Sequence, residues 1–154
     1  MSSNFGSTSH RALRQMVSRT LDLTLWALQV LAALVFLIFG ANKFDPEGSF
    51  WTALFGKAGG SYWIEVFGKI GLGQWFRYFT GCLETVCAIL LLIPRTATIA
   101  AVLLSCTMIG AILTHIFLLR DGLAVVWVCV VLLLILSAIG WKRRKRSPRL
   151  GGPQ

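Results

Sequence analysis

Four long hydrophobic segments dominate the chain, and each is long enough to cross a membrane. The first, residues 23–42, and the last, residues 122–141, contain twenty residues each without a charged side chain. At 1.5 Å per residue, a helix of that length spans roughly 30 Å, the thickness of a bilayer's hydrocarbon core. The third segment, residues 96–119, holds one titratable group, His115, and the second reaches a comparable length over residues 73–93. The pattern predicts four transmembrane helices.

A soluble helical bundle would need a polar face that repeats along each helix, and these segments do not offer one. Residues 31–39 and 128–136, for example, are apolar without interruption. The composition agrees, with 56% hydrophobic and 14% charged residues. We therefore predict an all-α integral membrane four-helix bundle over residues 22–141. A basic amino-terminal segment, residues 1–21, precedes it, and a basic tail, residues 142–154, follows it.

The net charge of +9 would suggest nucleic acid in a soluble protein, but here the basic residues gather at particular helix ends. If the helices alternate in direction, ten Lys and Arg residues fall on the side of the two termini and five on the other side. The positive-inside rule then places both termini in the cytoplasm and makes the lipid bilayer, not nucleic acid, the partner. We expect a bacterial cytoplasmic (inner) membrane. The acid-free, Ser-rich first twenty residues also resemble a mitochondrial transit peptide, which leaves the mitochondrial inner membrane as the alternative.

The largest segment outside the predicted spans, residues 44–72, joins the first two helices and is rich in aromatic residues. Within it, Trp63, Phe67 and Ile70 share one helical face while Glu65 and Lys69 share the other, as in a helix that lies in the membrane interface. Two roles remain open for this segment. It can be a lid that packs over the bundle, or an entrance for a lipophilic ligand.

Titratable side chains inside the predicted spans are the candidate functional groups, because a charge at the bilayer centre costs about 2.5–3.5 kcal/mol. Glu84 lies deep in the second segment, on the same helical face as Arg77. Lys43 and His115 end the first and third segments at the side opposite the termini, so we expect them to share a layer with Arg77. The predicted intramembrane polar site consists of Lys43, Arg77, Thr80, Glu84, Thr114 and His115.

Structural roles are the alternative for these groups: Glu84 accepts hydrogen bonds from a neighbouring helix, with Gln29 as a candidate donor, and His115 caps the exposed end of its helix. A carboxyl that exchanges a proton suits quinone or proton chemistry. The other histidine, His10, lies in the amino-terminal segment, and the four cysteines form no Cys-x-x-Cys pair. We expect neither a metal site nor a covalently bound cofactor, and a buried carboxyl of this kind is compatible with a bound quinone.

Four short motifs occur in order along the chain: Gly-Ala-Asn-Lys-Phe at 40–44, Thr-Gly-Cys-Leu-Glu at 80–84, Leu-Ile-Pro-Arg-Thr at 92–96 and a segment ending in Leu-Thr-His at 113–115. Together they resemble the DoxX and DoxX-like family of small four-helix membrane proteins. The resemblance covers residues 23–141. It implies a link to membrane redox complexes, since the family's name comes from a small subunit associated with a quinone-linked terminal oxidase and thiosulfate oxidation. It transfers no catalytic residues.

The leading functional hypothesis is a small accessory subunit of a quinone-linked redox or respiratory complex, contributing to a quinone or proton site and without catalytic activity in isolation. The expected partners are the other subunits of that complex. Two alternatives belong to other classes. One is a quinone-linked oxidoreductase that acts alone, and the other is a carrier or channel for a small solute.

The topology can be tested with single cysteines placed in a cysteine-free variant at Ser61 and at Ser147. The positive-inside rule predicts that a membrane-impermeant thiol reagent applied to intact cells labels the first and not the second. Equal labelling of the two positions would contradict the assignment of the termini to the cytoplasm.

Overall fold

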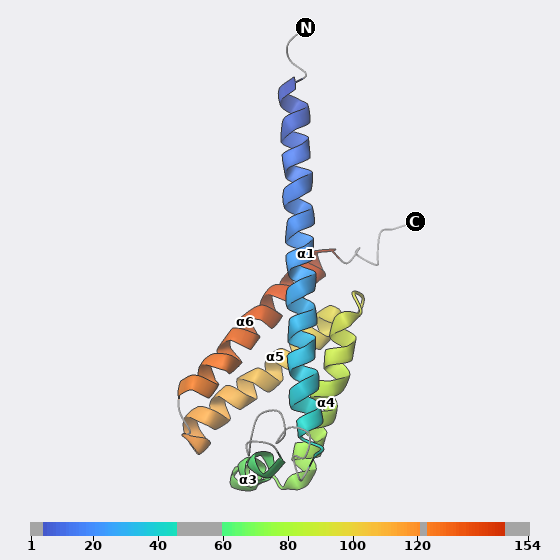
Figure 1. The fold of residues 1–154 in the computed structure, drawn as a ribbon. Helices are drawn as coiled ribbons and strands as arrows, with labels where there is room; N and C mark the ends of the chain where they lie inside the picture. Colours follow the sequence, from blue (N-terminus) through green and yellow to red (C-terminus); the bar gives the residue numbers. More distant parts are fainter. Residues whose placement is uncertain (1–4, 46–59, 121–122, 147–154) are drawn as a thin grey trace, which may run out of the picture.

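The computed structural model describes residues 5–45, 60–120 and 123–146, and it is helical throughout these ranges apart from short turns (Figure 1). The elements are α1 (Phe5–Asn42), α3 (Gly60–Ile70), α4 (Gln74–Leu92), α5 (Ala97–Thr114), the π-helical turn η1 (His115–Leu119) and α6 (Leu123–Arg146). α1, α4, α5 with η1, and α6 are each long and apolar enough to cross a membrane. The all-α membrane bundle predicted from hydropathy is confirmed.

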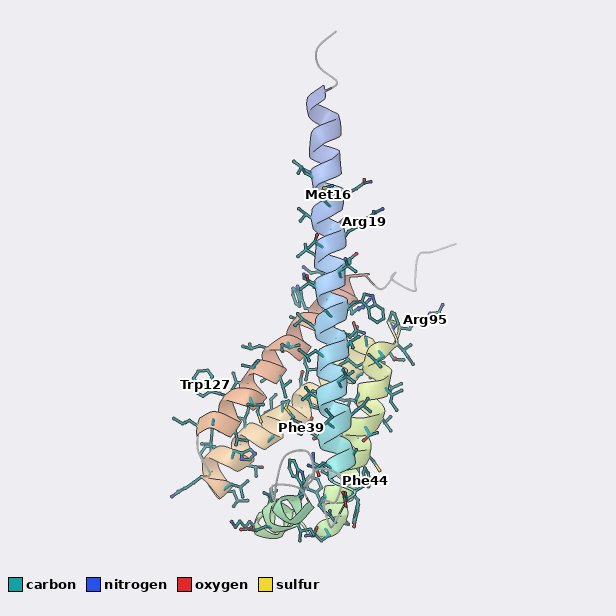
Figure 2. All side chains as sticks on the ribbon, viewed as in Figure 1. Met16, Arg19, Phe39, Phe44, Arg95 and Trp127 are labelled. Atoms are coloured by element: carbon teal, nitrogen blue, oxygen red, sulfur yellow. The ribbon has the colours of Figure 1, made fainter. Side chains whose placement is uncertain are left out.

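Two of the helices extend well beyond the hydrophobic segments that predicted them. α1 begins at Phe5, not near residue 23, and α6 continues from residue 141 to Arg146. Met16 and Arg19 lie on the part of α1 that stands beyond the other helices (Figure 2). Hydropathy marks where a helix lies in lipid, whereas the helix itself continues until a glycine, a proline or a cap ends it.

The four spanning helices form two pairs, α1 with α4 and α5 with α6, which lie close at one end and separate toward the other (Figure 1). The core lies at the close end, where α4 turns into α5. Small side chains allow the helices to approach there, because Ala33, Ala88, Ala97 and Ala100 are completely buried. At the other end the pairs diverge, and α3 lies across the opening.

A polar contact ties three helices together at the close end. Gln29 of α1 is completely buried and donates a hydrogen bond to the carbonyl oxygen of Leu91 at the end of α4. Arg143 of α6 donates from Nε and Nη2 to Gln29 Oε1, at 3.0 and 2.7 Å. The side-chain amide is thus satisfied on both its groups, as a buried polar group requires. Gln29 was the candidate hydrogen-bond donor to Glu84 in the structural alternative. That candidate is wrong, because Gln29 lies at the other end of the bundle and bonds Leu91 and Arg143.

At the open end, two glycines bring the backbones of α1 and α4 together. A Cβ atom on Gly40 would meet Thr85 Oγ1, and a Cβ atom on Gly81 would lie 3.1 Å from the Lys43 Cβ atom and 3.2 Å from the Gly40 carbonyl oxygen. Larger side chains at either glycine would push the two helices apart. This close approach sets the distance between the end of α1 and the middle of α4, where the charged residues lie.

α3 has the amphipathic character that its sequence predicts. Val66 and Phe67 are buried, while Glu65 and Lys69 are exposed and paired at 2.8 Å on the outer face. The Phe67 ring packs against Phe76 of α4 with 5.9 Å between ring centroids. α3 is therefore held against α4 by its apolar face. Residues 46–59 of the same connecting segment lie outside the described residues.

Candidate functional site

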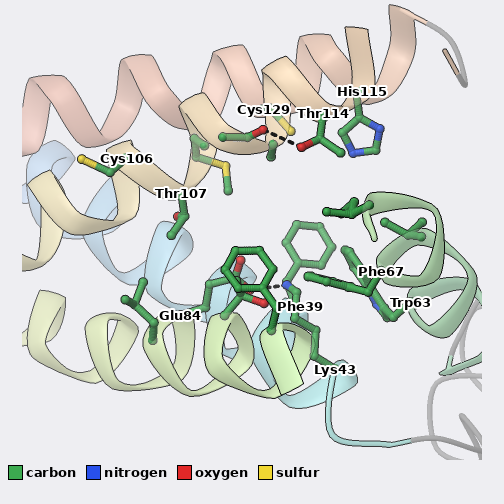
Figure 3. Close-up of a pocket in the computed structure, with 18 of the residues that line it drawn as sticks. Phe39, Lys43, Trp63, Phe67, Glu84, Cys106, Thr107, Thr114, His115 and Cys129 are labelled. Carbon is green, nitrogen blue, oxygen red and sulfur yellow. Dashed lines mark hydrogen bonds and ion pairs between the residues drawn. The ribbon is translucent and has the colours of Figure 1, made fainter. Parts of the chain in front are cut away.

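A cavity of about 680 Å³ lies between the two helix pairs, at the end where they diverge (Figure 3). α1 and α4 form one wall, α5 and α6 form the opposite wall, and the buried face of α3 closes the end. The lining is mostly apolar. Its polar side chains include five of the six residues predicted for an intramembrane site: Lys43, Thr80, Glu84, Thr114 and His115.

The α1–α4 wall carries a buried ion pair. Lys43 Nζ lies 2.5 Å from Glu84 Oε2, and the two residues are 3% and 6% exposed. The same ammonium lies over the ring of Trp63 in α3, 4.3 Å from its centroid. Lys43 therefore joins three elements, because it directly follows the last residue of α1, its ammonium pairs with Glu84 of α4 and its cation–π contact reaches α3.

Arg77, the sixth predicted residue, is not among the cavity-lining residues, but it contacts the backbone of Lys43, which is one of them. Its guanidinium donates to the Lys43 carbonyl oxygen at 2.8 Å and to the Tyr78 hydroxyl oxygen at 2.9 Å. The carbonyl groups of the last helical turn lack partners within the helix. Arg77 satisfies one of them and so fixes the backbone that carries the Lys43 side chain. Arg77 and Glu84 thus belong to one polar network, with Lys43 between them.

The opposite wall places hydroxyl groups and an imidazole on one face of α5. Thr107 and Thr114 donate to carbonyl oxygens of their own helix, Leu104 at 2.7 Å and Gly110 at 2.9 Å. Because each hydroxyl proton is used in this way, the hydroxyl oxygens of these two cavity-lining residues can act only as hydrogen-bond acceptors. Thr107 was not part of the site predicted from the sequence.

His115 lies where α5 changes into the π-helical turn η1. It stands at the C-cap position of α5, as the structural alternative supposed, but its side chain is buried and lines the cavity. The Arg120 amide donates to the His115 carbonyl oxygen at 2.9 Å, five residues back, and Arg120 adopts a left-handed conformation with φ 49°. π-turns of this kind occur frequently at functional sites.

Several lining residues could not have been assigned from the sequence. Trp63 is the clearest, since its amphipathic position indicates a buried face but not that it contacts Lys43. Cys106, Met108 and Cys129 bring sulfur atoms to the α5–α6 wall, although their spacing matches no motif. Among the described residues, no group of three or more His, Cys, Asp or Glu side chains could hold a metal ion.

The arrangement offers hydrogen-bond donors and acceptors on two facing walls, with apolar side chains between them. Lys43 and Glu84 supply a donor and a carboxylate on one side, and His115, Thr107 and Thr114 supply an imidazole and hydroxyl oxygens on the other. Such a site suits a flat, largely apolar molecule with a polar atom at each end.

The sequence profile of the DoxX-like family matches residues 27–139. The chain belongs to the DoxX-like family. The match covers residues 27–42 of α1, all of α3 to α5 and most of α6, and it includes both walls of the cavity. The DoxX-like family relationship predicted from four short motifs is therefore confirmed. Comparison with curated proteins and with solved structures found no match.

Paired substitutions test whether the two charges of the ion pair stabilise the fold as one coupled unit. Lys43→Met leaves the Glu84 carboxylate buried without its partner, so the free energy of unfolding should fall by about 3–5 kcal/mol. The double variant Lys43→Met with Glu84→Leu should recover most of that loss, since a buried pair is often replaced by apolar residues at little cost. Thermal unfolding in one detergent measures both. A double variant no more stable than Lys43→Met would show that the pair is not the coupled unit described here.

Proposed function

We propose that this DoxX-like protein binds a quinone in the cavity and serves as an accessory membrane subunit of a quinone-linked redox complex. The observation that carries the proposal is the buried Lys43–Glu84 ion pair in the wall of an apolar cavity at membrane depth. Buried ionisable groups within spanning helices are costly, and they commonly mark ligand sites or proton pathways.

The size and lining of the cavity support a lipophilic ligand. Its volume of about 680 Å³ lies in the range of small-molecule sites, and apolar side chains from four helices make most of its surface. Phe79 of α4 and Leu103 of α5 line the cavity and are 53% and 40% exposed, so the cavity is not sealed between these two helices. A ligand with an alkyl or isoprenoid tail would therefore reach the cavity from the bilayer, between these two helices.

The polar groups suit both redox states of a quinone. A bound quinone would supply a carrier of two electrons and two protons. The Lys43 ammonium and the His115 imidazole are positioned to donate to carbonyl oxygens at opposite walls. Glu84 and the hydroxyl oxygens of Thr107 and Thr114 are positioned to accept from the hydroxyl groups of the reduced form. Hydrogen bonds of this kind are strong inside a cavity from which water is excluded.

The electrons come from a partner in this proposal, and this chain orients the quinone and exchanges its protons. The accessory role rests on that division. The proposed location is a bacterial inner membrane, with the amino-terminal end of α1 and the carboxyl-terminal end of α6 on the cytoplasmic side. Basic side chains at that end, among them Arg14, Arg19, Arg143 and Lys145, support this orientation.

The binding proposal is tested by equilibrium binding of a short-tailed quinone to the protein in lipid nanodiscs, with empty nanodiscs subtracted. Wild type should bind saturably. His115→Ala should weaken binding about five- to tenfold, the effect of one lost hydrogen bond. Gly110→Leu should abolish it, because Gly110 lies at the centre of the cavity-facing side of α5 and a Cβ atom there meets no neighbour within 4 Å.

Ser137→Ala is the matched control, since this hydroxyl bonds only its own helix at Leu133 and does not line the cavity. It should bind quinone as wild type does.

The accessory role is tested separately, by capture from native membranes. A partner that bears a redox cofactor should co-purify with the protein, and Glu84→Gln should slow the quinone-linked turnover of that partner. Absence of saturable binding refutes the quinone site. Turnover or solute transport by the isolated chain refutes the accessory role.

A further inference from the structure

One face of α1 presents a regular apolar stripe that no other described element covers. The stripe follows a spacing of three and four residues over three full heptads and consists of Leu13, Met16, Thr20, Leu23, Ala27, Val30 and Leu34. All seven residues are exposed, and the large ones are 40–72% exposed. A strict seven-residue repeat of this kind is the pattern by which two helices pack along their length.

The stripe lies on the side of α1 away from its own bundle. The buried residues of α1, including Leu25, Gln29, Ala32 and Phe36, lie on the opposite side of the helix. The stripe therefore remains available when the four spanning helices are packed. It also continues from the membrane-spanning part of α1 into the part that stands beyond the other helices (Figure 2).

The apolar side chains on the part of α1 beyond the other helices are not covered by the hydrocarbon core of the bilayer. A twenty-residue span ending at Asn42 begins near Leu23, so Leu13, Met16 and Thr20 lie outside the hydrocarbon core if the helix stays straight, as it does here. Apolar side chains exposed there favour association through the hydrophobic effect, which acts in water but not between helices in lipid. The hydrophobic contribution to association of this face is thus concentrated in residues 13–23.

We propose that the stripe is a homodimer interface, in which α1 packs in parallel against α1 of a second copy. A second copy inserts with the same orientation and presents the same stripe at the same depth, so the two surfaces match in register. Thr20 and Ala27 are small and allow a close approach of the helices. The neighbouring charges fit as well: Arg14 and Asp22 lie off the contact, and Arg19 would face Thr24 of the partner, without a like charge opposite.

Disulfide cross-linking in native membranes tests this interface. In a full-length variant without the four native cysteines, a single cysteine at Met16 or Leu23 should cross-link between copies under mild oxidation. One at Ser18, on the side of the same helix opposite the stripe, should cross-link at least about fivefold less, because it points away from the partner. Equal cross-linking at the stripe and at Ser18, or none at either, would overturn the proposal.

A second measurement keeps the native cysteines and does not depend on the cysteine-free variant folding. Two differently tagged copies are co-expressed, and the recovery of one with the other is measured in mild detergent. Met16→Asp should reduce recovery about tenfold, whereas Ser18→Asp adds the same charge to the same turn and should leave it unchanged. The proposal would be overturned if wild-type copies did not co-purify, or if Met16→Asp copies still did.

Discussion

The ion pair between Lys43 and Glu84 is the contact on which the arrangement of the open end depends. In lipid, a charged group must find its partners within the protein, and these two residues are 41 positions apart in sequence. Their pairing fixes the end of α1 against the middle of α4, and the Lys43 contact with Trp63 fixes α3 as well. Arg77 holds the backbone of Lys43 in place. One positive charge therefore organises three elements around the cavity.

The distribution of side-chain size explains why a cavity exists at this end. Alanines fill the contacts near the α4–α5 turn, so the helix pairs approach closely there, and the Gln29–Arg143 contact locks that end. Toward α3, Phe39, Phe76 and Phe79 of the α1–α4 pair line the cavity, and α3 contacts both α4 and η1. Small residues thus bring the helix pairs together at one end, and α3 contacts both pairs at the other end. The cavity follows from that packing, and α3 closes it with an apolar face.

Hydropathy was sufficient to predict the four spans and the amphipathic α3, because each is a property of one segment: the length of an apolar run for the spans and helical periodicity for α3. The cost of a buried charge was sufficient to select Glu84. The partner of Glu84 could not be predicted, because it depends on how each helix is rotated and how deep each residue lies in the membrane. A local sequence pattern reports neither. For the same reason Gln29 was matched with the wrong end of the bundle, and the contact of Trp63 with Lys43 was missed. The length of α1 was also missed, because hydropathy does not report where a helix ends.

The central claim is that a quinone occupies the cavity between the two helix pairs, and photoaffinity labelling in native membranes tests it most directly. A photoreactive quinone, followed by peptide mass spectrometry, should label the cavity face of α5, around Thr107 and Thr114, and excess short-tailed quinone should suppress that label. Trp127 on the outer face of α6 is 65% exposed and reports contact from the bilayer alone. Labelling at Trp127 equal to that at Thr114, or a label on α5 that excess quinone does not suppress, would contradict the account.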